Sequence, residues 1–202
     1  MERPDFVHLH LHSEYSLSDG IIRIKELVSR ASSLQYSAVG LTDLTNLFGL
    51  LEFYRSSREK GIKPIVGAEV NVIKDKDSLP APIVLLVKDK QGYINLTKIV
   101  SKAYVDGQVN GEPMVELSLL QKYSEGLIAL SGGMEGHVGQ SILAGNIPLT
   151  ESRIKFFKSI FDEDFFIEVH RLGKTNEEEY NNAAVDIATK MDVPIVATNN
   201  VR

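Results

Sequence analysis

Three histidines on alternate positions near the N-terminus constrain this chain more than any other feature of its sequence. They are His8, His10 and His12, and only His137 and His170 occur besides them. Side chains two residues apart in a β-strand share one face, so a strand here would direct all three imidazoles to the same side. Neutral imidazole is the commonest metal ligand in proteins. The pattern therefore predicts a strand that carries a divalent metal site.

Carboxylates farther along the chain can complete such a site. Asp19 follows His12 closely, and Glu69 falls within a later apolar strand. We therefore predict a hydrolytic metal site of His10, His12, Asp19 and Glu69, in which the metal would acidify a bound water and neutralise phosphate charge. The alternative is that one or two histidines bind only backbone groups and that Asp19 caps a helix that begins near Ile21.

Apolar strands alternate with amphipathic helices along almost the whole chain. Strands of this kind are buried on both faces, which predicts a parallel α/β fold, either a βα barrel or a doubly wound sheet. In a barrel the functional groups sit at the carboxyl ends of strands, where we also find Asp43, His170, Asn199 and Asn200. We expect strands at residues 6–12, 37–43, 63–73, 83–88, 127–130, 165–170 and 194–199, and helices at 21–34, 47–60, 93–106, 117–123, 137–144, 150–161 and 176–191.

Composition excludes several classes of protein. The 202 residues are 43% hydrophobic and 24% charged, which is typical of a globular chain that can bury a full core. The absence of cysteine excludes disulfides and thiolate metal sites and favours a reducing compartment. There is neither a membrane-length apolar run nor an apolar signal core, so we expect a cytoplasmic protein without membrane contact. A net charge of −5 argues against a domain that grips DNA by itself.

Two weaker patterns have simpler explanations. Ser131-Gly132-Gly133 precedes a helix, but short glycine turns after strands are common and this one lacks the longer phosphate-binding fingerprint. Glu168 and His170 are expected to form a pair at the end of a strand rather than a catalytic unit. We therefore assign no catalytic residue from either pattern.

Several segments resemble a known family. His10-Leu11-His12, Ser16 and Asp19-Gly20 resemble the first motif of the polymerase-and-histidinol-phosphatase (PHP) domain. The resemblance extends over residues 6–202 and is closest to the PHP domain at the N-terminus of bacterial DNA polymerase III alpha subunits of gammaproteobacterial type. The segments that carry it are 8–16, 61–69, 92–96, 99–104, 125–133 and 196–199.

The resemblance implies an irregular seven-stranded βα barrel, with residues 1–202 as a single PHP domain excised from a much longer polymerase chain. The full-length protein would be a DNA-directed DNA polymerase that uses Mg²⁺, with its polymerase active site outside this segment. The implied partners are the proofreading exonuclease subunit and the rest of the polymerase chain and holoenzyme. DNA would be bound only through the full-length protein.

Departures from the family pattern affect the metal site. Positions at which metal-binding members carry ligands hold other residues here, namely Leu44, Pro82, Gly133, Leu172, Asn200 and Arg202. The four residues of the predicted site remain on ligand positions. We therefore expect a degenerate site that holds at most one weakly bound Zn²⁺ or Mn²⁺ and no phosphoesterase activity, because a two-metal mechanism needs both ions. The alternative is an active metal-dependent phosphoesterase, either a 3′–5′ exonuclease or a pyrophosphatase.

Overall fold

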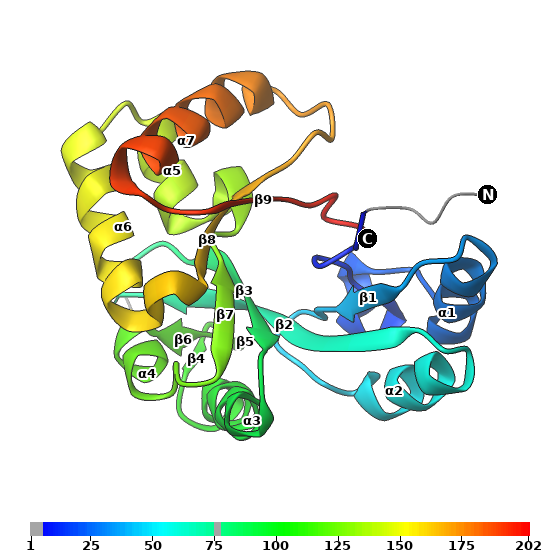
Figure 1. Cartoon of the computed structure of the whole chain (residues 1–202). Coiled ribbons are helices and arrows are strands. Elements are labelled where there is room, and N and C mark those ends of the chain that lie inside the picture. Colours follow the sequence, from blue (N-terminus) through cyan, green and yellow to red (C-terminus); the bar gives the residue numbers. More distant parts are fainter. Residues whose placement is uncertain (1–5, 75–77) are drawn as a thin grey trace.

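A curled, mixed β-sheet forms the centre of the protein, in a computed structural model that describes residues 6–74 and 78–202 (Figure 1). β3 is antiparallel to both of its neighbours, β2 and β7, whereas the remaining pairs are parallel. The expected α/β class is confirmed, but the parallel arrangement expected of the strands fails at β3. The strands of this central sheet, in spatial order, are β1 (Ala38–Leu41), β2 (Lys63–Ile73), β3 (Ala81–Val87), β7 (Leu127–Leu130), β8 (Phe165–Val169) and β9 (Ile195–Ala197). The short β6 (Val115–Glu116) lies beside β2.

The reversal at β3 has a simple cause. β2 ends at Ile73 and β3 begins at Ala81. A parallel connection needs about a dozen residues or more to cross over, and the segment between these two strands is shorter. An antiparallel pair is the arrangement that so short a connection permits.

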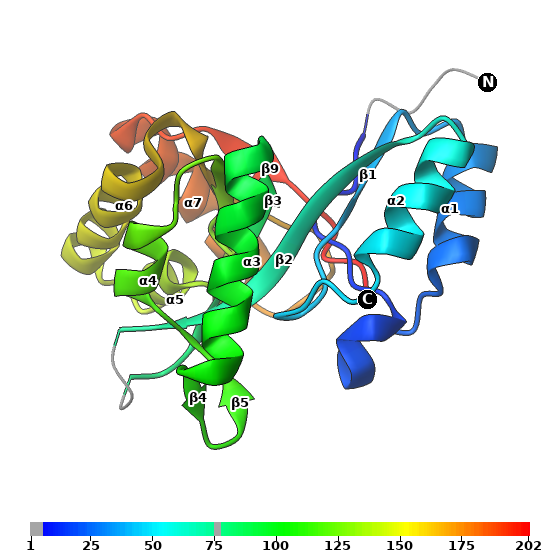
Figure 2. The same ribbon diagram turned by 90° about the horizontal axis from the view of Figure 1, so that it is seen from below.

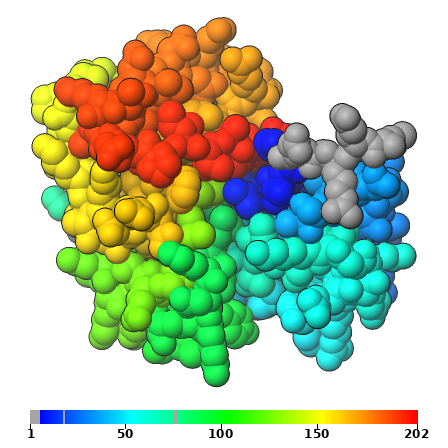
Figure 3. Space-filling model, viewed as in Figure 1, coloured from blue at the N-terminus to red at the C-terminus, as the bar shows by residue number. Residues whose placement is uncertain are grey.

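The N-terminal histidine segment joins the two edges of the curled sheet. Its backbone accepts hydrogen bonds from Gly40 in β1 and from Thr42, at 2.7 and 2.9 Å, and exchanges two more with Val201, which follows β9, at 2.9 and 3.0 Å. Only Leu11 lies in a ladder bridge, so the strand expected at residues 6–12 is instead an extended segment. On the surface this segment lies directly beside the C-terminal residues (Figure 3).

Helices cover the outside of the sheet, and each of the seven expected helices is present with bounds shifted by a few residues. Figure 2 shows the longest of them packed along β2 and β3. No helix within residues 6–74 and 78–202 combines the length and the apolar character that a bilayer crossing requires. The helices are α1 (Ile24–Ser33), α2 (Leu50–Glu59), α3 (Lys90–Val105), α4 (Leu117–Lys122), α5 (His137–Leu143), α6 (Ile147–Phe161) and α7 (Glu177–Met191).

Short elements complete the chain. Three 3₁₀ helices, η1 (Glu14–Asp19), η2 (Gly133–Glu135) and η3 (Asp162–Asp164), were not expected from the sequence. Residues 108–113 form a two-stranded hairpin of β4 (Gln108–Val109) and β5 (Glu112–Pro113).

The buried side chains form three groups that fix the curvature of the sheet. A large cluster packs β2, β3, β7 and β8 against α3, α5, α6 and α7, and a smaller one packs α1 and α2 against β1 and Leu11. The third lies on the inner face of the sheet, where Val84, Leu86 and Leu130 contact Leu9 and Phe166, among others. This inner apolar layer forms the floor on which the polar site is built.

Candidate functional site

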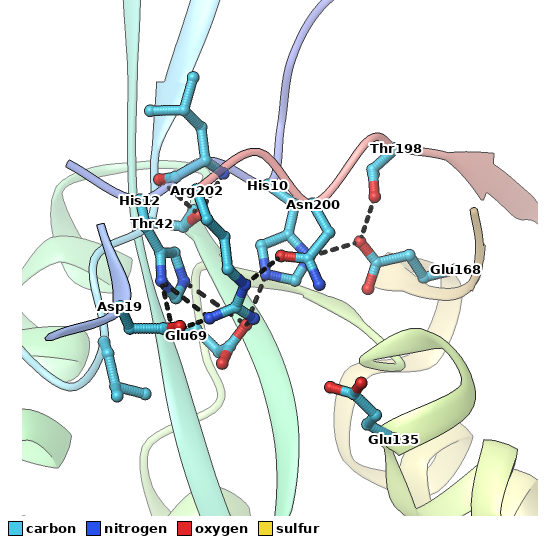
Figure 4. Close-up of polar contacts among 12 residues, drawn as sticks. His10, His12, Asp19, Thr42, Glu69, Glu135, Glu168, Thr198, Asn200 and Arg202 are labelled. Atoms are coloured by element: carbon cyan, nitrogen blue, oxygen red, sulfur yellow. Dashed lines mark hydrogen bonds and ion pairs between the residues drawn. The ribbon is translucent and has the colours of Figure 1, made fainter. Parts of the chain in front are cut away.

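A ring of polar side chains, called here the polar ring, lies on the inner face of the sheet, and most of its members are labelled in Figure 4. It consists of His10, His12, Asp19, Glu69, Glu168, His170 and Arg202. Glu168 and Thr198 each follow an inward-facing apolar residue of their strand, Phe166 and Val196, by two positions. Because side chains alternate along a strand, these polar groups share the inner face with the floor beneath them. Glu168 and Thr198 lie at the carboxyl ends of β8 and β9, as expected for functional groups of a barrel, whereas Glu69 lies in the interior of β2.

His10 lies between two carboxylates and is 1% exposed. Its Nε2 lies 2.5 Å from Glu69 Oε2, and its Nδ1 lies 2.9 Å from Glu168 Oε1. Burial opposes the charged imidazole, but the charge and hydrogen bonds of Glu168 and Glu69 outweigh it and raise the pKa of His10 to about 9. Although burial acts in the other direction, the two histidines in contact with Glu69 lower the pKa of that carboxyl to about 2. In the metal-free site, the proton on His10 therefore balances part of the carboxylate charge.

Glu168 is the centre of the second half of the site. Its Oε1 accepts a hydrogen bond from Thr198 Oγ1 at 2.6 Å and lies 3.2 Å from His170 Nε2. Burial opposes ionisation, but His10 and His170 hold the pKa of Glu168 below its ordinary value. The sequence did contain a signal for this residue, because Glu168 precedes His170 by two positions and must share its face of the strand.

Gly133 makes room for the His170 ring. A Cβ atom built on Gly133 would lie 2.5 Å from Cε1 and 2.8 Å from Nδ1 of that imidazole. Gly133 also has a φ of +61°, in the left-handed region that favours glycine. The imidazole therefore occupies the space that a side chain at position 133 would need.

Arg202 fills the other half of the site. Its guanidinium contacts the carboxylate of Asp19, and its Nη2 lies 3.3 Å from Glu69 Oε2. Nη1 also lies 3.2 Å from His12 Nδ1, which is itself 3.1 Å from Asp19 Oδ2. Figure 4 shows the guanidinium between the Asp19 and Glu69 side chains. A fixed positive charge thus lies among three of the four predicted metal ligands.

Asp43 shapes the loop that carries Asp19. Its buried carboxylate accepts hydrogen bonds from Ser13 N at 2.6 Å, from Ser13 Oγ at 2.8 Å and from Ser16 Oγ at 2.7 Å. These bonds hold the first turn of η1 against the end of β1. Asp43 is therefore an anchor of the loop rather than a member of the polar ring.

The structure brings all four predicted ligands, His10, His12, Asp19 and Glu69, into one cluster. The expectation that three imidazoles share a face is wrong for His8, whose ring packs against Phe6 and Tyr36. The extended segment is not a regular strand there, so strict alternation does not apply.

The expectation that Asp19 caps the following helix is also wrong. α1 begins at Ile24, its N-cap residue is Arg23, and no side chain caps it. The side chain of Asp19 is instead engaged by His12 and Arg202.

Two triads have ligand atoms close enough to share one metal ion: His10, His12 and Glu69, and His10, Glu168 and His170. In the first triad the guanidinium of Arg202 already lies against Glu69, so a divalent cation there would face a fixed positive charge. Among the described residues, three buried atoms of the two triads have no hydrogen-bond partner: His12 Nε2 in the first, and Glu168 Oε2 and His170 Nε2 in the second. Of these, His12 Nε2 lies 3.5 Å from Glu69 Oε2 and His170 Nε2 lies 3.2 Å from Glu168 Oε1. Both triads therefore contain unsatisfied donor atoms, and they differ in that the guanidinium of Arg202 lies against the first.

Comparisons with known proteins agree with this architecture. Residues 8–172 match the PHP domain family. The chain is 40% identical over 203 residues to the DNA polymerase III subunit alpha of Vibrio cholerae and 43% identical over 204 residues to that of Escherichia coli K12. Each match covers 100% of this chain but only 17% or 18% of the relative, so the chain spans less than a fifth of these proteins.

Solved structures show the same fold at low identity. A putative metal-dependent phosphoesterase from Bifidobacterium adolescentis has a TM-score of 0.63 at 14% identity, with 99% of this chain and 89% of that chain covered. An amidohydrolase from Chromobacterium violaceum, with bound sulfate and no metal, has a TM-score of 0.63 at 17% identity, with 96% and 87% covered. At these identities the likeness extends to the fold and not to the chemistry.

Proposed function

Because the chain belongs to the PHP domain family, with polymerase III alpha subunits among its relatives, we propose that it is the N-terminal PHP domain of a replicative DNA polymerase. In this proposal the domain is a structural and docking module without hydrolytic activity of its own. The full-length protein carries out DNA-directed DNA synthesis with Mg²⁺, through residues outside this segment.

The observation that carries the loss of hydrolysis is the position of Arg202. A two-metal phosphoesterase holds two ions about 3.5–4 Å apart, so that both the attacking and the leaving oxygen are stabilised. Here the guanidinium of Arg202 forms ion pairs with Asp19 and with one oxygen of Glu69. Both residues stand at positions that correspond to metal ligands in the resemblance to the family. Arg202 thereby supplies a positive charge in place of a metal ion. A guanidinium has no coordination position at which a water or a substrate oxygen could bind.

The residues that remain support one ion at most. His10, His12, Asp19 and Glu69 are the residual ligand set of this proposal, and Arg202 competes for two of them. A single Zn²⁺ or Mn²⁺ would then be weakly bound and would act on the stability of the domain. No step of a reaction depends on it.

The charge of the chain favours protein partners over direct DNA binding. The net charge of −5 disfavours direct contact with phosphates, so DNA is bound through the rest of the full-length protein. We assign the proofreading exonuclease subunit and the remaining holoenzyme as partners, and the cytoplasm as the compartment.

Two assays test the proposal together. The purified chain, supplied with Mn²⁺ or Zn²⁺, is incubated with p-nitrophenyl phosphate, pyrophosphate and 3′-labelled single-stranded DNA, and we expect no turnover above that of an Asp19→Asn variant. The same chain is immobilised and probed with the purified exonuclease subunit, for which we expect specific retention. Metal-dependent turnover that the Asp19→Asn variant loses would establish the rival phosphoesterase function and refute ours.

A further inference from the structure

Two buried polar atoms of the second triad make no hydrogen bond, although His170 Nε2 forms an ion pair with Glu168 Oε1 at 3.2 Å. Glu168 Oε2 and His170 Nε2 are inaccessible to solvent and make no hydrogen bond within the described part of the chain. Leaving a buried donor or acceptor unpaired costs about 1–3 kcal/mol each. A cation bound between Glu168 and His170 would satisfy both atoms.

We propose that the chain binds a single Zn²⁺ ion through His10, Glu168 and His170. This proposal rests on the proposed function of a docking module with at most one ion, but it assigns that ion to a different ligand set, on the opposite side of His10 from Asp19 and His12. It also gives a role to two residues that the sequence alone indicated only as a pair at the end of a strand.

The donor set favours zinc. Two imidazole nitrogens and one carboxylate oxygen form a recurring set of three protein ligands for Zn²⁺, with a fourth position left to water. Mg²⁺ and Ca²⁺ prefer oxygen donors, so a set rich in imidazole discriminates against them. His10 Nδ1 and His170 Nε2 lie 2.9 and 3.2 Å from the same oxygen of Glu168, which is close enough to share one ion.

Each ligand is held in place by a second group. Glu69 Oε2 lies 2.5 Å from the far nitrogen of His10, and Thr198 Oγ1 donates to Glu168 Oε1 at 2.6 Å. A carboxylate on the distal nitrogen of a ligating histidine fixes its orientation and raises its basicity, as in many zinc sites. Under this proposal, Glu69 therefore supports the ion through His10 without contacting it.

The backbone of β8 is fixed as firmly as the side chains. Ser131 Oγ accepts a hydrogen bond from Glu168 N at 2.9 Å, and Tyr180 donates to the Glu168 carbonyl at 2.7 Å. Asn181 Nδ2 donates to the His170 carbonyl at 2.6 Å, while Gly133 leaves room for the imidazole on its other side. The site is thus preorganised, which lowers the entropy cost of binding an ion.

Charge separates this site from the first triad. Arg202 lies against Asp19, His12 and Glu69, and no ion pair between Arg202 and Glu168 or His170 is found in the described part of the chain. A divalent ion at the second triad therefore contacts carboxylate and imidazole atoms that the guanidinium leaves free. One ion per chain is the stoichiometry that this division predicts.

Metal analysis with matched variants tests the proposal. The chain is stripped with EDTA, reloaded with Zn²⁺, dialysed and analysed by elemental mass spectrometry, and its zinc affinity is measured by competition with a chromogenic chelator. We expect one zinc per chain, and an affinity lowered about 100-fold or more in Glu168→Gln and His170→Gln, because loss of a supporting residue alone costs 10–100-fold. His8→Gln is the matched control, since His8 is a histidine of the same segment outside both triads.

Substitution with Co²⁺ in the unmutated chain reports on the ligands without any variant, so the test survives a variant that fails to fold. A visible absorption band typical of four-coordinate nitrogen and oxygen ligation supports the site. Absence of zinc overturns this inference while leaving the docking module intact. One zinc that is lost in His12→Gln but kept in His170→Gln also overturns it, by placing the ion in the first triad. Two or more zinc ions with turnover would overturn both the inference and the proposed function.

Discussion

Replacing Asp43 with alanine should destabilise the chain severely, although Asp43 lies outside the polar ring. The carboxylate is 1% exposed and accepts hydrogen bonds from Ser13 N, Ser13 Oγ and Ser16 Oγ. Hydrogen bonds to charged groups contribute about 1.5–3 kcal/mol each, and the substitution also leaves the Ser13 N–H buried without this partner. We take the lower end for three coupled bonds and expect a loss of about 4 kcal/mol.

The assay is urea unfolding followed by circular dichroism, with thermal melting in parallel. For a chain of this length, 1 kcal/mol shifts Tm by about 2–4 °C, so Asp43→Ala should lower Tm by about 8–16 °C. Asp43→Asn keeps one acceptor oxygen and should lie between the alanine variant and the unmutated chain. Asp106→Ala is the control, because Asp106 is exposed and pairs only with Lys102 of its own helix, an interaction of about 0.3–0.5 kcal/mol.

Asp43→Ala should have a second effect, on the contact between Asp19 and Arg202. Because Asp43 anchors the segment that leads to Asp19, its loss should also weaken the contact between Asp19 and Arg202. Unfolding free energies of Asp43→Ala and Asp106→Ala that agree within about 1 kcal/mol would show that the three hydrogen bonds do not contribute as argued.

Three further predictions concern the site and its surroundings. Arg202→Met should lower the unfolding free energy by about 1 kcal/mol at low salt, because the ion pairs of Arg202 are partly exposed. The difference from the unmutated chain should shrink at about 1 M salt, and a difference that salt leaves unchanged would contradict this. Gly133→Ala should destabilise the chain more than Gly61→Ala, as thermal melting can measure, since both glycines have positive φ but only Gly133 has the His170 ring in its Cβ position. Burial and the neighbouring Arg153 lower the pKa of His137 in the folded chain below 6.5. The unfolded chain then binds more protons than the folded chain, so the unfolding free energy should fall as pH drops below 6.5. Urea unfolding of His137→Gln at several pH values should show a shallower fall.

The sequence was sufficient for the elements whose signals are local. The seven helices were predictable because their apolar positions repeat with helical spacing, and β2, β3, β7 and β8 because their side chains are apolar over several successive residues. The N-terminal histidine segment was misjudged because alternation describes a regular strand, and only Leu11 forms a ladder bridge. The η1 turn was not predicted because it depends on Asp43, which is distant in sequence from the serines that it holds.

The candidate site shows the same division. His10, His12, Asp19 and Glu69 could be predicted as a cluster, since their residue types and their resemblance to a family motif are visible in the sequence. The role of Arg202 could not be predicted. An arginine at a ligand position indicates only the loss of a metal ligand until its contacts with Asp19 and Glu69 are known. The position of the His170 ring could not be predicted for a related reason, since it depends on the space left by Gly133 in η2, which is distant in sequence.

These contacts explain why a domain without hydrolytic activity would keep so many buried charges. The segments at residues 8–12 and 199–202 join the two edges of the sheet through isolated bridges rather than long ladders. The side chains of the ring connect the same segments: His10 ties the first to β2 and β8, and Arg202 ties the last to η1 and β2. The pairs of His10 are buried, and breaking such a pair by removing one partner costs about 3–5 kcal/mol, whereas the partly exposed pairs of Arg202 contribute less. Under the proposed function, selection for a stable docking module would preserve a polar ring that holds the sheet closed, without any selection for hydrolysis.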